Sequence, residues 1–293
     1  SQYLFQKSID LSIKKIRFYK EKQRLEKENY LKEFEEISDL NSKIKETLNR
    51  IPLGSDIYVN FLKSYTYLKE SENLYKIGKL EKAKTKLASA QFLNEKLFSQ
   101  IKDSLKSFYS PEKIREWKNL YNEALNLSSS SSVIVVIKDE RVLKVLRNGR
   151  VFKLYSVEFG KNPLSKKTKS GDLATPEGRY KITEKKGFGR TKYYLALLLN
   201  YPNEEDKRRF EEAKRKGLIP KNSKIGGLIE IHGDGGLGID WTQGCVALSN
   251  EDMKDLYNLS FVGMPVYIIG SVGNNDVLSN LEEEKIWKNS KNS

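Results

Sequence analysis

The chain has 293 residues, enough for two domains of ordinary size. Hydrophobic residues make up 38% and charged residues 31%, and no apolar run reaches the roughly 18 residues of a membrane span. The formal net charge is +14, with 25 Lys and Arg against 18 Asp and Glu in residues 1–127, and 28 against 21 in residues 128–293. Because this excess is diffuse and mostly lysine, we expect no specific binding of nucleic acid.

The chain has one cysteine and one histidine. A single cysteine excludes an internal disulfide and a zinc site made of several thiolates, and a single histidine excludes a multi-histidine metal site. We therefore expect neither a metal nor another cofactor. The first residue is Ser1 rather than Met, so we expect that an upstream tag or targeting segment has been removed.

Apolar residues recur at helical spacing through the first part of the chain. The spacing predicts one long helix, or two nearly continuous ones, over residues 3–49, and further helices at 55–78, from about 79, and from Pro111 after the cap residue Ser110. We expect residues 1–127 to form an all-α domain that supports the rest of the chain or binds a partner protein.

Residues 74–90 carry small side chains where two of these helices would cross, at Gly78, Ala83 and Ala90. This pattern resembles one tetratricopeptide-like unit. It is also typical of an ordinary helical hairpin, and a solenoid normally needs at least about three repeats.

Five consecutive serines at 128–132 predict a flexible linker. After them the apolar pattern changes to the alternation of short strands, at residues 133–137, 141–146, 151–159, 178–183, 192–199, 228–231 and 265–269. Two helices are predicted among these strands, around 204–216 and 251–259. We therefore expect an α+β chain, with a mostly-β domain over 133–270 and a polar tail over 271–293 in which 282–285 could form a surface helix.

The chemistry-bearing residues lie close together in this second half. His232 follows a predicted strand and opens a glycine-rich loop, and Cys245 comes 13 residues later. A lone cysteine or histidine is more often structural, but here the only two lie in one segment. An imidazole within reach of a thiol can take its proton, and glycines leave backbone N–H groups free to bind an oxyanion. The pattern fits a nucleophilic cysteine with a histidine base about as well as it fits two structural residues.

Two motifs resemble those of the L,D-transpeptidase catalytic domain, the YkuD-like family. His232-Gly233 followed by Thr242-Gln243-Gly244-Cys245-Val246 matches the family signature of HG, a variable stretch, then S/T-x-G-C and a hydrophobic residue. GDLATPEGRY at 171–180 matches the family segment G-D-x-x-T-P-E-G-x-Y. The resemblance covers about residues 132–270 and implies a β-sandwich with inserted helices. The helical half lies outside it.

The resemblance implies a role for each site residue. Cys245 would be the nucleophile that attacks the amide before the D-alanine of a peptidoglycan stem tetrapeptide, leaving a thioester. His232 would be the base, oriented by the backbone carbonyl of Gly233. The N–H groups of Gly244 and Cys245 would bind the oxyanion.

One residue departs from the family pattern. Many members have arginine two residues after the cysteine, where this chain has Ala247. In this respect the chain is similar to the branch of the family that resembles YafK. Transfer to an amine would make the protein a transpeptidase, and transfer to water a carboxypeptidase or a hydrolase that releases a wall-tethered lipoprotein. A non-catalytic wall-binding scaffold is the alternative of another class. The implied substrate places the protein in the cell envelope, in the periplasm.

Several other residues near the motif could have either a structural or a substrate-binding role. Trp241 could line an acceptor pocket or fill the core, Thr242 is expected to contact substrate, and Tyr193 and Tyr194 could face substrate or core. Asp234 and Asp240 are interpreted as turn residues rather than metal ligands. The segment at 175–178 is predicted to be a structural turn. The basic runs at 190–192 and 207–209 are predicted to be solvated, and they could also hold an acidic glycan.

Overall fold

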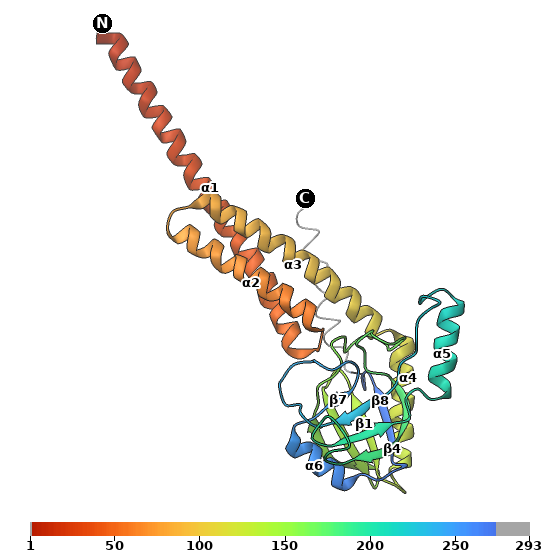
Figure 1. Ribbon diagram of the computed structural model, residues 1–293. Coiled ribbons are helices and arrows are strands. Elements are labelled where there is room, and N and C mark those ends of the chain that lie inside the picture. The colour runs from red at the N-terminus through yellow and green to blue at the C-terminus, as the bar shows by residue number, and fades with distance from the viewer. Residues whose placement is uncertain (1, 274–293) are drawn as a thin grey trace. The chain divides into compact units, whose positions relative to one another are not determined.

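The computed structural model describes residues 2–273 (Figure 1). Within them the chain forms two compact units, one made of residues 2–47 and 59–99, the other of residues 48–58 and 100–273. No helix among these residues is both long and apolar enough to cross a membrane. Apart from residues 271–273, the predicted tail and its helix at 282–285 lie outside the described residues.

The first unit is entirely helical. It contains most of α1 (Gln2–Arg50) and α2 (Ser55–Lys76) and the first part of α3 (Leu80–Phe108). The first predicted helical region is therefore one continuous helix. The core of the unit is apolar and uses small side chains where helices cross: Tyr30, Ile37, Leu68, Ala83, Leu87 and Ala90. Residues 74–90 form the turn of the α2–α3 hairpin, which agrees with the predicted pair of helices.

The second unit contains the strands. Its strands are β1 (Val133–Ile137), β2 (Val142–Arg147), β3 (Arg150–Ser156), β4 (Gly178–Lys186), β5 (Ala196–Leu199), β6 (Glu230–His232), β7 (Val246–Ala247) and β8 (Pro265–Ile269). Its helices, besides the end of α3, are α4 (Pro111–Leu127), α5 (Glu204–Arg215) and α6 (Asn250–Leu259). The α+β class predicted from the sequence is confirmed.

The strands form one curled sheet in the order β3-β2-β1-β8-β4-β5-β6-β7. β4 joins its two parts, because residues 178–181 pair with β8 and residues 182–186 pair with β5 across an irregularity at Ile182. After β3 the chain pairs back onto the far end of the sheet, at Glu158 with Ala247 and at Gly160 with Thr242. The predicted β-sandwich is therefore a single sheet that curls around one core.

Helix α4 belongs to the sheet unit (Figure 1). It packs against β1 and β8, and Trp117 is 1% exposed. A Cβ on Gly270 would lie 2.3 Å from the Trp117 ring, so glycine at 270 makes room for the indole. The division between the compact units therefore falls near residue 99, whereas the sequence predicted it at 128–132. The serine run continues the end of α4, where buried Ser128 donates its N–H to the carbonyl of Ala124.

Candidate active site

His232 is the last residue of β6, and its side chain is completely buried. Its Nδ1 lies 2.6 Å from the carbonyl oxygen of Gly233. Because a carbonyl oxygen only accepts, Nδ1 carries the hydrogen, and in the neutral ring Nε2 is a bare acceptor. Nε2 is buried and has no hydrogen-bond partner among residues 2–273. The ring is therefore held in the tautomer that a general base requires, with its basic nitrogen unoccupied.

Position 233 has no room for a side chain. A Cβ there would lie 2.5 Å from Oδ1 of Asn250 and 3.0 Å from the Cβ of Tyr194. The N–H of Asp234, which belongs to the same peptide as the Gly233 carbonyl, donates to Oδ1 of Asn250 at 2.7 Å and fixes the peptide whose carbonyl holds His232. The contact implied by the family resemblance is present, and its catalytic role stays a prediction.

Cys245 directly precedes β7, which lies beside β6. The two strands are parallel, with Ile231 opposite Val246 and His232 opposite Ala247. Side chains alternate along a strand, so Cys245 and Ala247 share a face with His232, while Ile231 and Val246 point into the core. The only cysteine and the only histidine are thus diagonal neighbours on one face of the sheet. Ala247, the departure from the family pattern, is completely buried on that face.

A tight turn before β7 presents the cysteine. The hydroxyl of Thr242 donates to the carbonyl of Cys245 at 2.8 Å and accepts the N–H of Gly244 at 3.2 Å. Thr242 is 2% exposed, so its side chain serves the turn, and its predicted substrate contact stays untested. Gly244 has φ of +127°, and a Cβ there would lie 2.7 Å from the carbonyl oxygen of Ala174, so only glycine fits.

Both reacting groups are shifted toward their neutral forms. Burial raises the pKa of the Cys245 thiol, although the backbone of Glu230 and the charges of Lys192 and Lys167 lower that pKa. Burial lowers the pKa of His232, against the opposing effect of its hydrogen bond to Gly233. The thiol also donates to the carbonyl of Leu228, with 3.7 Å between sulfur and oxygen. The resting pair is therefore a thiol beside a neutral imidazole rather than an ion pair.

Aromatic rings enclose the histidine. Tyr193 stacks on it with 3.5 Å between ring centroids and 6° between ring planes. Trp241 meets it edge-on, at 5.8 Å and 74°. Buried Glu158 holds this arrangement, because its carboxylate accepts the Trp241 indole N–H at 2.8 Å and the N–H of Gly238 at 2.5 Å. The sequence did not single out Glu158. Its one available signal was a charged residue at the end of an otherwise alternating strand.

The remaining predicted residues shape the loops. Tyr194 donates its N–H to the carboxylate of Asp234 at 3.2 Å, and Asp234 has the positive φ of a turn residue, +63°. Asp240 pairs with Arg141 at 2.7 Å and accepts the N–H of Phe159. Residues 2–273 contain no group of three or more His, Cys, Asp or Glu side chains that could hold a metal.

The turn at 175–178 has a structural role in the described fold. Glu177 is buried against Lys138, with 2.7 Å between Oε1 and Nζ, and it also accepts the indole N–H of Trp117 at 3.1 Å. The hydroxyl of Thr175 accepts the N–H of Gly160 at 3.2 Å. The turn therefore joins α4, β1 and the strand that closes the curled sheet.

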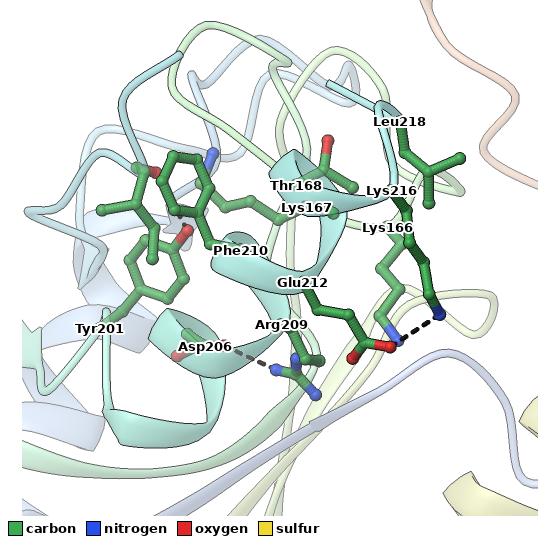
Figure 2. Close-up of a pocket in the computed structure, with 12 residues that line it drawn as sticks. Lys166, Lys167, Thr168, Tyr201, Asp206, Arg209, Phe210, Glu212, Lys216 and Leu218 are labelled. Carbon is green, nitrogen blue, oxygen red and sulfur yellow. Dashed lines mark hydrogen bonds and ion pairs between the residues drawn. The ribbon is translucent and has the colours of Figure 1, made fainter. Parts of the chain in front are cut away.

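A pocket of about 300 Å³ lies beside α5, in the same unit (Figure 2). Apolar side chains such as Tyr201 and Phe210 line it, together with basic ones, including Lys166 and Lys167. Arg209, from the basic run at 207–209, is held by Asp206 at 2.6 Å, as the dashed line in Figure 2 marks. Neither Cys245 nor His232 lines this pocket.

The family comparison identifies the sheet domain. Residues 131–268 match the family model of YkuD, the L,D-transpeptidase catalytic domain. The match covers a little under half of the chain. Helices α1 to α4 lie outside the match. A comparison with curated proteins gives no match.

Solved structures similar to this chain include L,D-transpeptidases. One match is the helical cell shape determining protein Pgp2 from Campylobacter jejuni, at 24% identity over 54% of this chain and 55% of that one, with a TM-score of 0.38. Another is an L,D-transpeptidase from Xylanimonas cellulosilytica, at 17% identity over 48% and 61%, with a TM-score of 0.32. A third is an L,D-transpeptidase from Mycobacterium smegmatis, at 15% identity over 47% and 58%, with a TM-score of 0.31. The match spans little more than half the length of each of these proteins.

Proposed function

We propose that this protein is a cysteine acyltransferase of peptidoglycan, an L,D-transpeptidase that forms a thioester on Cys245. The observation that carries the proposal is the arrangement of the only cysteine and the only histidine. They are diagonal neighbours on one face of adjacent parallel strands, and the Nε2 of His232 is buried without a partner. A structural histidine in a core normally has both nitrogens satisfied.

In the proposed reaction, Nε2 of His232 takes the thiol proton as Sγ of Cys245 bonds to the carbonyl carbon before the D-alanine of a stem tetrapeptide. The carbonyl oxygen becomes an oxyanion, for which the N–H groups of Gly244 and Cys245 are the proposed donors. The bond between carbon and nitrogen then breaks, and the imidazolium returns its proton to the departing amine. D-Alanine leaves, and an acyl thioester remains on Cys245.

Binding of the oxyanion requires a change at Gly244. Its N–H donates to the hydroxyl of Thr242 at 3.2 Å, a longer contact than the donors of an oxyanion normally make. The developing negative charge is a better acceptor than a hydroxyl, so this N–H moves to the oxyanion as Sγ attacks the carbonyl carbon.

The thioester can be resolved by an amine from a neighbouring stem, which gives a crosslink, or by water, which gives a trimmed stem. If the amide that tethers a lipoprotein to the wall is attacked instead, the lipoprotein leaves as the same acyl-enzyme forms, and water then resolves the thioester. Peptidoglycan lies outside the cytoplasmic membrane, so the proposal places the protein in the cell envelope, in the periplasm. Peptidoglycan stems are its proposed partners. A role of the helical residues in binding another protein stays a prediction.

Product analysis tests the proposal. Purified protein is incubated with a disaccharide-tetrapeptide, and the muropeptides are separated and identified by mass spectrometry. We expect release of D-alanine by the wild type, none by Cys245→Ala, and strongly slowed release by His232→Ala. A crosslinked dimer identifies transpeptidation, whereas a disaccharide-tripeptide identifies hydrolysis.

A matched control variant is Ser249→Ala, because Ser249 caps α6 and its side chain accepts only from the N–H of Asp252. It alters the same segment without touching either reacting group. Absence of product from wild type, together with retained binding to isolated peptidoglycan, would contradict the enzyme proposal and favour the wall-binding scaffold.

A further inference from the structure

The segment between β4 and β5 brings a lysine to the candidate site. The ammonium of Lys192 lies 4.9 Å from the centroid of the Tyr193 ring, and that ring stacks on His232. Two other cations of this region are already paired: Lys186 with Glu230 at 2.7 Å, and Arg190 with Glu184 at 2.5 Å. Among residues 2–273, Lys192 forms no ion pair with a carboxylate.

The charge of Lys192 and the thiol of Cys245 affect each other. Its hydrogen bond with the Tyr193 hydroxyl raises the pKa of Lys192, and Cys245 and Glu230 raise it further. The effect on the thiol is reciprocal: burial raises the pKa of Cys245, and the backbone of Glu230 and then the Lys192 charge lower it. The side chain of Lys192 is exposed, so its ammonium is available to a ligand. An accessible cation that forms no ion pair within residues 2–273 therefore lies next to the ring that stacks on His232.

The proposed donor has a matching anion. In a stem tetrapeptide only one residue follows the scissile bond, so its terminal carboxylate is separated from the attacked carbonyl by one nitrogen and one carbon atom. When that carbonyl meets Sγ of Cys245, the carboxylate must lie within a few ångströms of the sulfur. A cation near the thiol can therefore distinguish a terminal residue from an internal one.

We propose that Lys192 binds the terminal carboxylate of the acyl donor and selects stems whose scissile bond is followed by a single residue. The proposal rests on the function proposed above. It assigns Lys192 a role in specificity, whereas proton transfer stays with His232. Ala247 leaves the face of β7 next to Cys245 without a charge of its own, and Lys192 supplies a positive charge from a different segment.

A first test needs no turnover. Because Cys245 is the only cysteine, its alkylation by iodoacetate (anionic) and by iodoacetamide (neutral) can be followed by intact mass. We expect the iodoacetate-to-iodoacetamide rate ratio to fall roughly fivefold or more in Lys192→Met, because the attraction of a nearby cation is lost. The matched control is Arg190→Met, which removes a cation two residues away that is paired with Glu184. An unchanged ratio in Lys192→Met would overturn the proposal.

A second test uses the donor itself, as the tetrapeptide acid and as its C-terminal amide. Wild type is expected to prefer the acid by roughly tenfold or more in kcat/KM. Lys192→Met is expected to lose this preference mainly through a higher KM, and Lys192→Arg to keep most of it. A preference that survives in Lys192→Met contradicts the role of Lys192. If wild type turns over neither donor, the proposed function fails, and the alkylation ratio still decides whether the cation acts at the thiol.

Discussion

At the scale of single residues, the site is governed by desolvation. Burial raises the pKa of Cys245 and lowers the pKa of His232, and both shifts favour uncharged groups. The carbonyl of Gly233 fixes the hydrogen on Nδ1, so the neutral ring is already in its basic tautomer. In the proposed mechanism the proton therefore moves to His232 during attack, and no thiolate needs to be stored beforehand.

This neutral pair predicts a particular pH dependence of alkylation. The thiolate is the reactive species, and a raised pKa means that little of it exists at pH 7. We expect the iodoacetamide rate of Cys245 to rise about tenfold per pH unit from pH 6 to 8, without a plateau. A stored thiolate–imidazolium pair would instead give a rate that is constant over this range, and that result would contradict the assignment. The measurement is the rate of intact-mass labelling.

Residue rarity and motif spacing predicted the pair of Cys245 and His232 but not the residues around them. Cys245 and His232 could be named because they lie in one glycine-rich segment, and the Gly233 carbonyl was implied by the family resemblance. Tyr193 and Glu158 could not be placed, because each lies far from His232 along the chain and reaches it only through strand pairing. Lys192 was one of three residues in a basic run, and nothing local distinguishes a paired cation from an unpaired one.

At the scale of elements, α4 shows why the domain boundary predicted from local composition differs from the boundary between the compact units. The serine run has the composition of a linker, yet the helix before it packs on the sheet through Ile114, Trp117, Leu120 and Ala124. An amphipathic helix has one apolar face, and the sequence does not say which neighbour covers it. The observed cover includes a buried ion pair, Lys138 with Glu177, that also holds the Trp117 indole.

Removal of one partner of this pair should be costly. Lys138→Met leaves the Glu177 carboxylate buried without its cation, and we expect a loss of about 3–5 kcal/mol in the free energy of unfolding. The double variant Lys138→Met with Glu177→Leu removes both charges and should recover much of that loss. Urea unfolding followed by fluorescence measures all three proteins. Equal stability of the single and double variants would show that the isolated carboxylate is not the cause.

At the scale of the whole molecule, the class and most of the strand-forming segments could be predicted, whereas the short strand β7 and the order of the strands could not. Hairpins such as β1–β2 follow from short turns between neighbouring segments. The C-terminal strand β8, however, inserts between β1 and β4, where it is parallel to one and antiparallel to the other. That insertion depends on which long-range strand pairing buries the most apolar surface. It therefore cannot be predicted from the local apolar pattern.

The position of the unit boundary predicts the behaviour of fragments. A fragment of residues 100–273 keeps α4 on the sheet, whereas a fragment of residues 128–273 uncovers the surface that Trp117 occupies. Loss of a buried aromatic side chain alone costs about 3–5 kcal/mol. We expect the longer fragment to unfold cooperatively on heating and the shorter one to have a much lower midpoint or to aggregate. Equal midpoints, measured by circular dichroism, would place the boundary at the serine run.

The central claim is that Cys245 forms an acyl-enzyme. Intact-protein mass spectrometry after mixing with a disaccharide-tetrapeptide, or with a carbapenem as a surrogate acyl donor, tests it most directly. The proposed mechanism predicts one covalent adduct per chain in the wild type, none in Cys245→Ala, and strongly slowed formation in His232→Ala. A wild-type protein that gains no adduct from either donor, while its thiol still reacts with iodoacetamide, would contradict it.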